Sequence, residues 1–349
     1  MLKNKSLREF GYNFLGPIIA TYVTEVNRQL RQLASHTNVK VFHLAREGYV
    51  FEKAFDIVNN GNVASSYLNV SRTFLFRITC DIEESWKYSV KHSFKGTLGD
   101  FFKSRFAFTQ ENVEEFLDSG DLDKAISLPE DFDYICRILK ANQESIRKVT
   151  SPTREIYLNY LNSVGLTDST VTPVVLDVGY SGTIQKLLTL LLKKDISGIY
   201  MITTKSGQIE IGDNVASINH VFKTDVKMGG GYMMLDRSMF LESLLTAPNG
   251  QFVDILQNVN NDSFHFCYGK QTYTQENFTD LATVQGGALS CVEDCIKHTV
   301  LYSVEEIEEL FETYVTHRNL LPRATWPLFV LDDAISGEGN LNPLSFFGL

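Results

Sequence analysis

The amino-acid sequence predicts an α/β fold whose sheet is mostly parallel, with a helical insertion and a mostly helical C-terminal extension. Two observations lead to this prediction. In two separate parts of the chain, a short apolar run is followed by a polar turn and then by apolar residues at helical spacing, as in strands connected by helices. Between these parts lies a charged stretch without the alternation typical of strands. The chain of 349 residues is long enough for such a fold.

The composition excludes some classes of function. Hydrophobic residues make up 44% of the chain and charged residues 21%, close to the averages of globular proteins, so we expect the whole chain to fold. The formal net charge of -10 and the lack of a dense Lys/Arg stripe argue against binding of nucleic acid. An anionic ligand must therefore be met locally, by backbone N–H groups, a metal ion or a few arginines.

Cysteine usage and hydropathy predict where the protein works. The cysteines form an odd, irregularly spaced set, unlike the framework of a secreted disulfide-rich protein. No apolar run approaches the roughly 20 residues that cross a bilayer. We therefore expect a cytoplasmic protein without a transmembrane segment, for which peripheral contact with the inner face of the cell membrane stays open.

Residues 1–80 are predicted to form the first half of the α/β core, with an N-terminal helix. Apolar residues at 15–33 recur at helical spacing. An apolar run at 39–44, a polar turn and a helical pattern at 49–58 predict a strand, a turn and a helix, the last ending at an Asn-Asn-Gly stop. A second β-like run at 66–70 closes a βαβ unit, which implies parallel strands.

The rest of the chain divides into further predicted parts. A helical insertion is expected at 81–165, because this segment is charged and places aromatic residues at helical spacing. The second half of the core, at 166–250, repeats the strand-turn-helix pattern and adds further strands. Residues 251–349 are predicted to form the C-terminal extension, first with irregular or hairpin structure and then with helices.

The segment V-V-L-D-V-G-Y-S-G-T-I-Q, at 174–185, is the most informative motif. A hydrophobic strand carries Asp177 to its carboxyl end, and Gly179 and Gly182 permit a tight turn. The helix start that follows has free N–H groups and a positive dipole end, which favour a phosphate. A carboxylate beside a bound phosphate suits ribose-type hydroxyls or a magnesium ion. The plainer interpretation is an ordinary βα turn whose glycines serve geometry alone.

The segment V-F-H-L-A-R-E-G-Y-V-F, at 41–51, has the same strand-turn-helix form. Arg46 and Gly48 lie where a guanidinium and backbone amides can hold a second phosphate or a pyrophosphate. Two such turns at neighbouring strand ends suit a ligand with phosphates at both ends. The alternative is that Arg46 and Glu47 are a solvated pair in a turn.

Other candidates carry less information. Arg72, with Ser71 just past the second predicted strand, either places a guanidinium at the same sheet edge or forms a surface salt bridge. Glu242, near a helix start, either orients or deprotonates an acceptor hydroxyl or faces solvent. The spacing of Cys291 and Cys295 fits one helix face, but core packing explains it better than a zinc site, which needs four ligands.

The turn D-V-G-Y-S-G-T resembles the phosphoribosyl-pyrophosphate (PRPP) signature of type I phosphoribosyltransferases, and the A-R-E-G turn is similar to the pyrophosphate loop of that fold. The resemblance implies a Rossmann-like parallel sheet of that kind and Mg²⁺ as cofactor. It assigns Asp177 to the ribose hydroxyls and to the metal. The other positions that it implies are Ser181, Gly182 and Thr183 for the 5-phosphate, and Arg46, Glu47 and Gly48 for the pyrophosphate. Ser71 and Arg72 are placed to complete the pyrophosphate side, and Gly179 and Tyr180 are further predicted substrate-binding residues.

The sequence departs from that signature at two positions. Leu176 occupies the place of the first of two adjacent acidic residues, and Ile184 that of the last Thr. The motif D-D-A-I-S-G at 332–337 also spells the signature, but the Gly, Asn and Pro residues after it do not favour the helix start that an anion site needs. A phosphatase of the haloacid-dehalogenase type is rejected, because it needs a second Asp two positions after the nucleophile, where Gly179 follows Asp177.

More of the chain, including L-G-P-I-I at 15–19 and L-E-S-L-L-T-A-P at 241–248, is similar to a module of bacterial capsule and O-antigen gene clusters that is often labelled a haloacid-dehalogenase-like hydrolase. This resemblance implies transfer of 5-phosphoribose from PRPP to a sugar hydroxyl of a lipid-linked or polymeric glycan, with a separate phosphatase acting on the product. Arg46, Asp177 and Glu242 are the predicted catalytic residues. A nucleotide-sugar glycosyltransferase and a non-catalytic scaffold of polysaccharide assembly stay open as alternatives.

Overall fold

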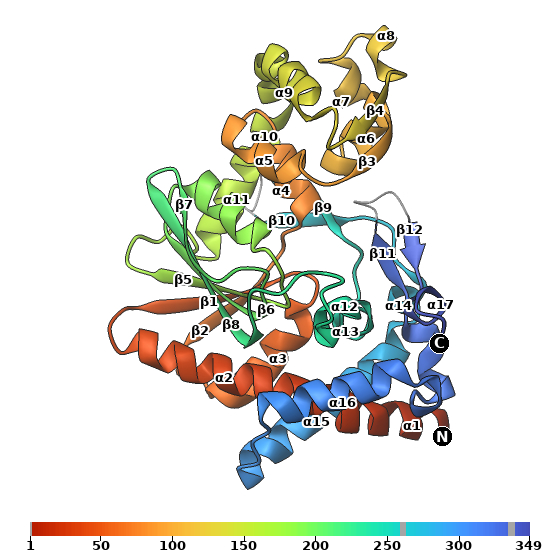
Figure 1. Ribbon diagram of the computed structural model, residues 1–349. Coiled ribbons are helices and arrows are strands. Elements are labelled where there is room, and N and C mark those ends of the chain that lie inside the picture. The colour runs from red at the N-terminus through yellow and green to blue at the C-terminus, as the bar shows by residue number, and fades with distance from the viewer. Residues whose placement is uncertain (1, 259–262, 334–338) are drawn as a thin grey trace.

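A computed structural model describes residues 2–258, 263–333 and 339–349. Its scaffold is a six-stranded sheet with the order β2-β1-β5-β6-β8-β7 (Figure 1). Neighbouring strands are parallel except for β7, which pairs antiparallel with β8. The predicted α/β class with a mostly parallel, Rossmann-like sheet is therefore confirmed. The strands are β1 (Val39–Leu44), β2 (Ala64–Leu68), β5 (Thr172–Asp177), β6 (Ile196–Ile202), β7 (Gly207–Ile211) and β8 (Asn214–Lys223).

The strand order creates a switch point beside β1. After β1 the chain crosses to β2 on one side, and it later returns to β5 on the other side of β1. The carboxyl ends of β1 and β5 therefore border a shared crevice, which is where ligands bind to open α/β sheets. The two turns predicted to bind phosphate directly follow these two strands.

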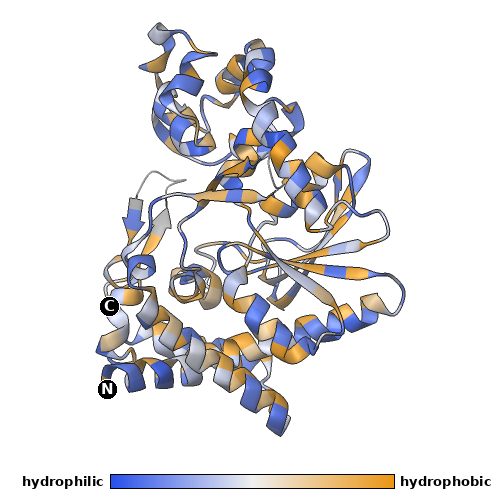
Figure 2. Cartoon of the chain, turned by 180° about the vertical axis from the view of Figure 1, so that it is seen from behind, coloured by the Kyte–Doolittle hydropathy of each residue, from blue (hydrophilic) through white to orange (hydrophobic). Residues whose placement is uncertain are grey.

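Helices cover both faces of the sheet because the central strands are apolar on both sides. In β1, Val41 belongs to the hydrophobic core on one face and Phe42 to the core on the other. Figure 2 shows hydrophobic residues concentrated on the strands and on the helix sides that face them. The covering helices are α2 (Gly16–Ala34) and α3 (Gly48–Asn59) on the first face, and α4 (Arg72–Ile78), α10 (Gln143–Ser163) and α11 (Thr183–Leu192) on the second.

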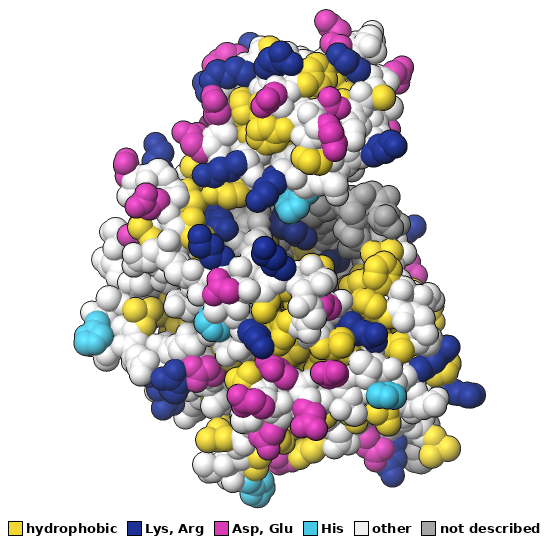
Figure 3. Space-filling model, in the orientation of Figure 1, with side chains coloured by type: hydrophobic (Ala, Val, Ile, Leu, Met, Phe, Trp, Pro, Cys, Tyr) yellow, Lys and Arg dark blue, Asp and Glu magenta, His cyan; other side chains and the backbone are white. Residues whose placement is uncertain are grey.

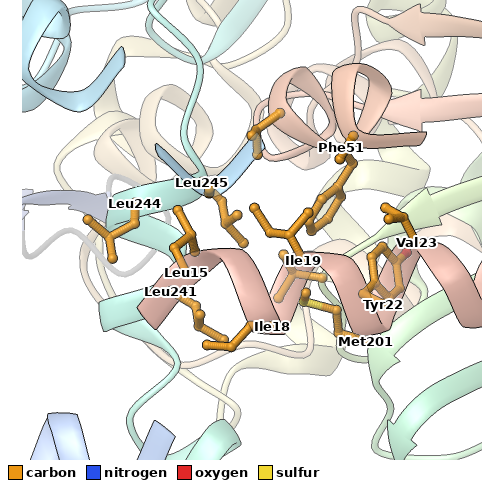
Figure 4. Packing of buried hydrophobic residues seen from close by; sticks show 14 of the residues in the cluster. Leu15, Ile18, Ile19, Tyr22, Val23, Phe51, Met201, Leu241, Leu244 and Leu245 are labelled. Carbon is orange, nitrogen blue, oxygen red and sulfur yellow. The ribbon is translucent and has the colours of Figure 1, made fainter. Parts of the chain in front are cut away.

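The inner side of α2 connects the first core to the end of β5. Ile19 and Tyr22 point toward Phe51 of α3 and Met201 of β6 (Figure 4). The rings of Tyr22 and Phe51 lie 4.8 Å apart between centroids. The buried Tyr22 hydroxyl also lies 3.2 Å from the carbonyl oxygen of Asp177, to which it donates. The core thus holds the strand end that carries the predicted site.

The C-terminal helix α15 (Phe278–His298) belongs to the same core as the N-terminal helices. It lies beside α1 (Leu2–Phe10) and the π-helix η1 (Gly11–Leu15), so the two ends of the chain pack together (Figure 1). A Cβ atom on Gly11 would lie 1.9 Å from the carbonyl oxygen of Val284, so this approach requires glycine. The mostly helical C-terminal extension is therefore an integral part of the main body.

The insertion forms a mostly helical lobe at the top of Figure 1, packed around buried residues that include Phe101, Phe102 and Phe106. It also contains an antiparallel pair of short strands, β3 and β4, that the sequence analysis does not predict. Each has only four residues, too few for a recognisable alternation. The elements of the lobe are α5 (Glu83–Ser89), β3 (Phe94–Thr97), α6 (Leu98–Phe106), α7 (Gln110–Glu114), α8 (Ser119–Leu122), β4 (Ala125–Leu128) and α9 (Phe132–Ala141).

Smaller elements complete the chain. β9 (Phe252–Gln257) and β10 (Phe264–Tyr268) form an antiparallel hairpin in the region predicted to be irregular or a hairpin. Across the described ranges, no helix combines the length and the apolar character needed to cross a membrane. The remaining elements are α12 (Met233–Asp236), α13 (Met239–Leu245), α14 (Tyr273–Glu276), α16 (Val304–Thr316), η2 (Arg318–Leu320), η3 (Arg323–Leu328), β11 (Leu331–Asp333), β12 (Gly339–Leu341) and α17 (Pro343–Phe346).

Candidate functional site

A pocket of about 230 Å³ lies at the switch point, at the carboxyl ends of β1, β2 and β5. Its lining is mostly polar and comes from segments that are far apart in the sequence. Such a concave polar site is the default place to look for ligand binding. The sequence-predicted residues that line it are Arg46, Glu47, Ser71, Arg72, Asp177, Gly179, Tyr180, Ser181, Thr183 and Glu242.

The turn after β1 runs directly into α3. The Glu47 carboxylate accepts a hydrogen bond from the backbone N–H of Arg46, with an N–Oε2 distance of 3.1 Å. The Ala45–Arg46 peptide bond is cis. Among the described residues, the Arg46 guanidinium has no ion-pair partner, so its donors stay available to an anion in the pocket. Gly48 is buried as the first residue of α3 and does not line the pocket.

The turn after β5 leads into α11. A Cβ atom on Gly179 would lie 2.5 Å from the carbonyl oxygen of Ile202, which explains why glycine is needed there. Gly182 is the N-cap of α11, with a left-handed φ of 66°, and lies behind the pocket lining. The hydroxyl oxygens of Ser181 and Thr183 lie 3.0 Å apart in the lining. They stand beside the free N–H groups of the first helical turn, an arrangement that favours a phosphate.

The segment after β2 contributes the hydroxyl of Ser71 and the guanidinium of Arg72. The Ser71 hydroxyl caps α4 by accepting from the N–H of Phe74 (3.1 Å) and donates to the carbonyl oxygen of Phe252 (2.6 Å). These bonds use the hydroxyl, so Ser71 shapes the pocket. Arg72 is exposed and forms no ion pair within the described part of the chain, and its positive charge lowers the pKa of Asp177. The guanidinium therefore faces the pocket carboxylates.

Glu242 enters the pocket from α13. Its Oε1 atom accepts a hydrogen bond of 2.7 Å from the hydroxyl of Tyr180, which belongs to the turn after β5. Burial raises the pKa of Glu242, and the nearby charge of Glu47 raises it further. The hydrogen bond from Tyr180 and the charge of Arg72 act in the opposite direction. Glu242 is thus a carboxylate with a raised proton affinity.

The pKa of Asp177 is strongly perturbed by its surroundings in the pocket. Burial raises its pKa well above the ordinary value of 3.8, and the charge of Glu47 adds to this rise. A hydrogen bond of 2.9 Å from the N–H of Val178 and the charge of Arg72 only partly offset these effects. A carboxyl group whose pKa is raised by burial and by a neighbouring carboxylate favours a bound cation or hydroxyl donors, which relieve the repulsion.

The pocket fits a magnesium ion in one particular way. Among the residues that the structure describes, no group of three or more His, Cys, Asp or Glu side chains is placed to hold a metal ion by itself. Magnesium is usually bound through one or two carboxylates and completes its shell with water and substrate phosphates. Asp177, with its raised pKa, is the carboxylate suited to that role, so a magnesium ion fits together with a phosphorylated ligand.

The structure adds two lining residues that the sequence analysis does not identify, Gln251 and Phe252. The Gln251 amide donates to the hydroxyl of Thr73 (3.0 Å), across a sequence separation of 178 residues. Phe252 is buried and packs edge-on against Phe74, with ring centroids 4.6 Å apart. No local spacing signals these contacts, because they depend on how the β9–β10 hairpin meets α4.

The buried cysteine pair is not part of the pocket lining. Cys291 and Cys295 are buried on α15, with sulfur atoms 3.9 Å apart, in the core against the N-terminal helices. Of the D-D-A-I-S-G motif at 332–337, positions 334–337 lie outside the described residues.

Comparison with known proteins does not assign the chain to a family. No protein-family model matches it, and no curated protein matches it significantly.

Proposed function

We propose that the chain transfers 5-phosphoribose from PRPP to a sugar hydroxyl of a bacterial surface glycan and releases pyrophosphate. The observation that carries this proposal is the convergence of Arg46, Arg72, Asp177 and the hydroxyl-bearing start of α11 in one pocket. A ligand with phosphates at both ends and hydroxyls between them matches this distribution of cations, carboxylate and helix N–H groups.

The donor is held at both of its ends. Ser181, Thr183 and the first N–H groups of α11 bind the 5-phosphate, and Asp177 accepts hydrogen bonds from the ribose hydroxyls. Arg46 and Arg72 bind the pyrophosphate. When the bond between C1 and the pyrophosphate oxygen breaks, the electron pair goes to that oxygen, and the guanidinium groups stabilise the charge that develops there.

Glu242 accepts the proton of the acceptor hydroxyl while the hydroxyl oxygen forms the new bond to C1. Its raised pKa suits this role, because a base works best when its pKa lies near the working pH. Asp177 would hold Mg²⁺, which would supply positive charge to offset part of the negative charge of the pyrophosphate. The lipid-linked or polymeric acceptor, the phosphatase that acts on the product and the cytoplasmic location are proposed on the family resemblance.

Isothermal titration of the full chain with PRPP tests the proposal directly. We expect binding that requires Mg²⁺ and that weakens at least about tenfold in Asp177→Asn, because the metal and the ribose lose their carboxylate. The matched control is Asp213→Asn, which removes an exposed carboxylate from the β7–β8 turn of the same sheet. This control is expected to bind PRPP like the wild type.

Uridine diphosphate sugars, titrated in parallel, separate the alternatives. Binding of a nucleotide sugar without binding of PRPP would replace the proposal with a nucleotide-sugar glycosyltransferase. Binding of neither ligand would favour the scaffold. Where PRPP binds, ³¹P NMR of pyrophosphate release with a panel of glycan acceptors then identifies the second substrate.

A further inference from the structure

A group of lysines borders the pocket outside its lining. Lys87 and Lys91 come from the helical lobe, Lys186 from α11, and Lys205 from the segment after β6. Burial lowers the pKa of Lys186, and the positive charges of the other three lysines lower it further. Figure 3 shows Lys and Arg side chains gathered where the lobe meets the sheet. We call these four lysines the cationic rim.

The lysines of the cationic rim lack acidic partners in the described part of the chain. Over the ranges that the structure describes, none of its four lysines forms an ion pair with Asp or Glu. This is unexpected in a chain with 42 acidic residues against 32 Lys and Arg. Neighbouring cations without counterions repel one another and create a positive potential that attracts anions.

A buried arginine supports the lobe side of the cationic rim. The Arg105 side chain is fully buried, and its guanidinium donates to the carbonyl oxygens of Ser89 (2.7 Å) and Ser93 (3.1 Å), as well as to that of His92. Lys91 lies in the loop that these bonds hold. Because α5 packs against α11, both sides of the rim also rest on packed helices. The lysines are therefore presented on a preorganised support.

The cationic rim is continuous with the pocket at two points. The Lys186 ammonium donates to the carbonyl oxygen of Ser181, whose hydroxyl is in the pocket lining. The charge of Arg72 lowers the pKa of both His92, beside the rim, and Asp177, in the pocket, although burial is the larger influence on His92. At least one lysine of the rim, Lys186, therefore lies directly beside the pocket lining.

We propose that the cationic rim binds a phosphate or diphosphate group of the second substrate while the donor occupies the pocket. The choice of the second substrate rests on the proposed function. In the proposed function the donor phosphates already have Arg46, Arg72 and the start of α11 as partners, so a phosphate of the second substrate needs other cations. Lysine ammonium groups bind phosphate as point charges, and several of them match a multiply charged group better than a single carboxylate or a neutral sugar.

Isothermal titration calorimetry with inorganic pyrophosphate at low ionic strength tests the proposal. We expect the wild type to bind two equivalents, one in the pocket and one at the rim. In Lys87→Gln/Lys91→Gln the rim equivalent weakens about tenfold or more, while the pocket equivalent and PRPP affinity stay unchanged. The matched control, Lys148→Gln/Lys297→Gln, removes two exposed lysines elsewhere and keeps both equivalents.

Other outcomes overturn the proposal. A single equivalent in the wild type, or two undiminished equivalents in the rim variant, would mean that the rim is not an anion site. A rim variant that loses PRPP affinity would assign the rim to the donor. If the wild type binds pyrophosphate at the rim but does not bind PRPP, the proposed function fails and with it the assignment to a second substrate, whereas the anion site itself stands.

Discussion

Asp81 is buried and Asp177 is partly buried in the pocket lining, and of the two only Asp81 is paired with cations of the described chain. The Asp81 side chain is 2% exposed and contacts two guanidinium groups, with Arg147 Nε at 3.1 Å and Arg154 on the other oxygen. Asp177 accepts a hydrogen bond from the N–H of Val178 and forms no ion pair within the described residues. The chain has the means to pair a buried carboxylate and does not use them at the pocket.

We interpret this difference as that between a structural charge, at Asp81, and a charge left for a ligand to neutralise, at Asp177. A buried charge without a partner is costly, and proteins normally pair it or keep the group neutral. At Asp177 the raised pKa is the sign of that cost. Sites where such a cost is retained are those at which a ligand later supplies the missing charge or hydrogen bonds.

The largest effect is expected for Asp81→Ala. Removal of this carboxylate leaves Arg154, whose side chain is only 17% exposed, without its counterion. Breaking a buried pair from one side costs about 3–5 kcal/mol of unfolding free energy. Urea denaturation followed by circular dichroism measures this loss.

The control for Asp81→Ala uses the same arginine. Glu144 is 77% exposed and also pairs with Arg147, at 3.0 Å. Glu144→Ala is expected to cost less than about 1 kcal/mol, because an exposed pair is screened by water. Equal losses of stability in the two variants would show that the buried pairs of Asp81 do not stabilise the fold more than an exposed pair does.

His43 extends the comparison to a buried base. Neither ring nitrogen has a hydrogen-bond partner within the described residues, and burial lowers the pKa of the ring from 6.5 to about 3. Because the folded pKa lies below the unfolded one, the stability present above pH 6.5 is lost as the pH falls toward 3. From pH 6.5 to 4.5 we expect His43 to account for a loss of roughly 2–3 kcal/mol.

His43→Leu isolates this contribution, since the variant keeps every other titrating group. Urea denaturation at several pH values should give a shallower decline in stability for the variant than for the wild type below pH 6.5. Parallel declines would mean that the ring finds a partner in solution. His43 also shows that a buried group without a partner need not be functional, because a neutral imidazole can persist in the core where a carboxylate at neutral pH cannot.

Asp177→Asn tests the functional side of the comparison and has the opposite sign. The folded pKa of Asp177 is raised above the ordinary value, so its contribution to stability is present in acid and is lost as the pH rises through the folded pKa. At pH 8 and without ligand, the amide variant is expected to be more stable than the wild type by about 1–2 kcal/mol. At pH 4 this advantage should vanish.

Paired denaturation curves at the two pH values measure the difference. A variant less stable than the wild type at pH 8 would show that Asp177 is held by favourable contacts, as Asp81 is. Together with the loss of PRPP affinity proposed above, a gain in stability would identify a residue at which function opposes folding.

The parts of the pocket that the sequence predicts are those formed by residues that are close together in the sequence. The strand that ends at Asp177 and the turn and helix after it occupy one continuous segment, as do those around Arg46. Parallel strands end at the same edge of a sheet, so predicting both strands was enough to predict that these side chains lie near each other. The observed pairing of β1 with β5 provides this arrangement.

The contacts that the sequence does not predict depend on distant packing. Arg147 and Arg154 reach Asp81 across 66 and 73 residues, and no pattern around Asp81 specifies which cations will do so. The same is true of Gln251 and of the cationic rim, whose lysines come from three separate elements. Their placement follows from how the helical lobe packs on the sheet, which local periodicity does not encode.

The smallest effect is expected at Glu242. Its carboxylate accepts a hydrogen bond from a side chain, the hydroxyl of Tyr180, and forms no ion pair within the described residues. The Tyr180 hydroxyl lowers the pKa of Glu242 by donating to the charged form. Tyr180→Phe should therefore raise that pKa further. If Glu242 is the base in the proposed transfer, the acid limb of kcat/KM moves to higher pH by the same amount.

The matched control is Tyr232→Phe, which removes a similar hydrogen bond of 2.8 Å to Glu308 outside the pocket. Both variants lose one Tyr–Glu bond and are expected to lose similar, small amounts of stability, but only Tyr180→Phe should shift the pH profile of pyrophosphate release. A shift in both variants would indicate a general effect on folding, and a shift in neither would exclude Glu242 as the group that titrates. A shift confined to Tyr180→Phe would mean that the hydrogen bond from Tyr180 offsets only part of the rise in the pKa of Glu242. Glu242 then keeps enough proton affinity to act as a base, whereas the charge of Asp177 is neutralised only when a ligand binds.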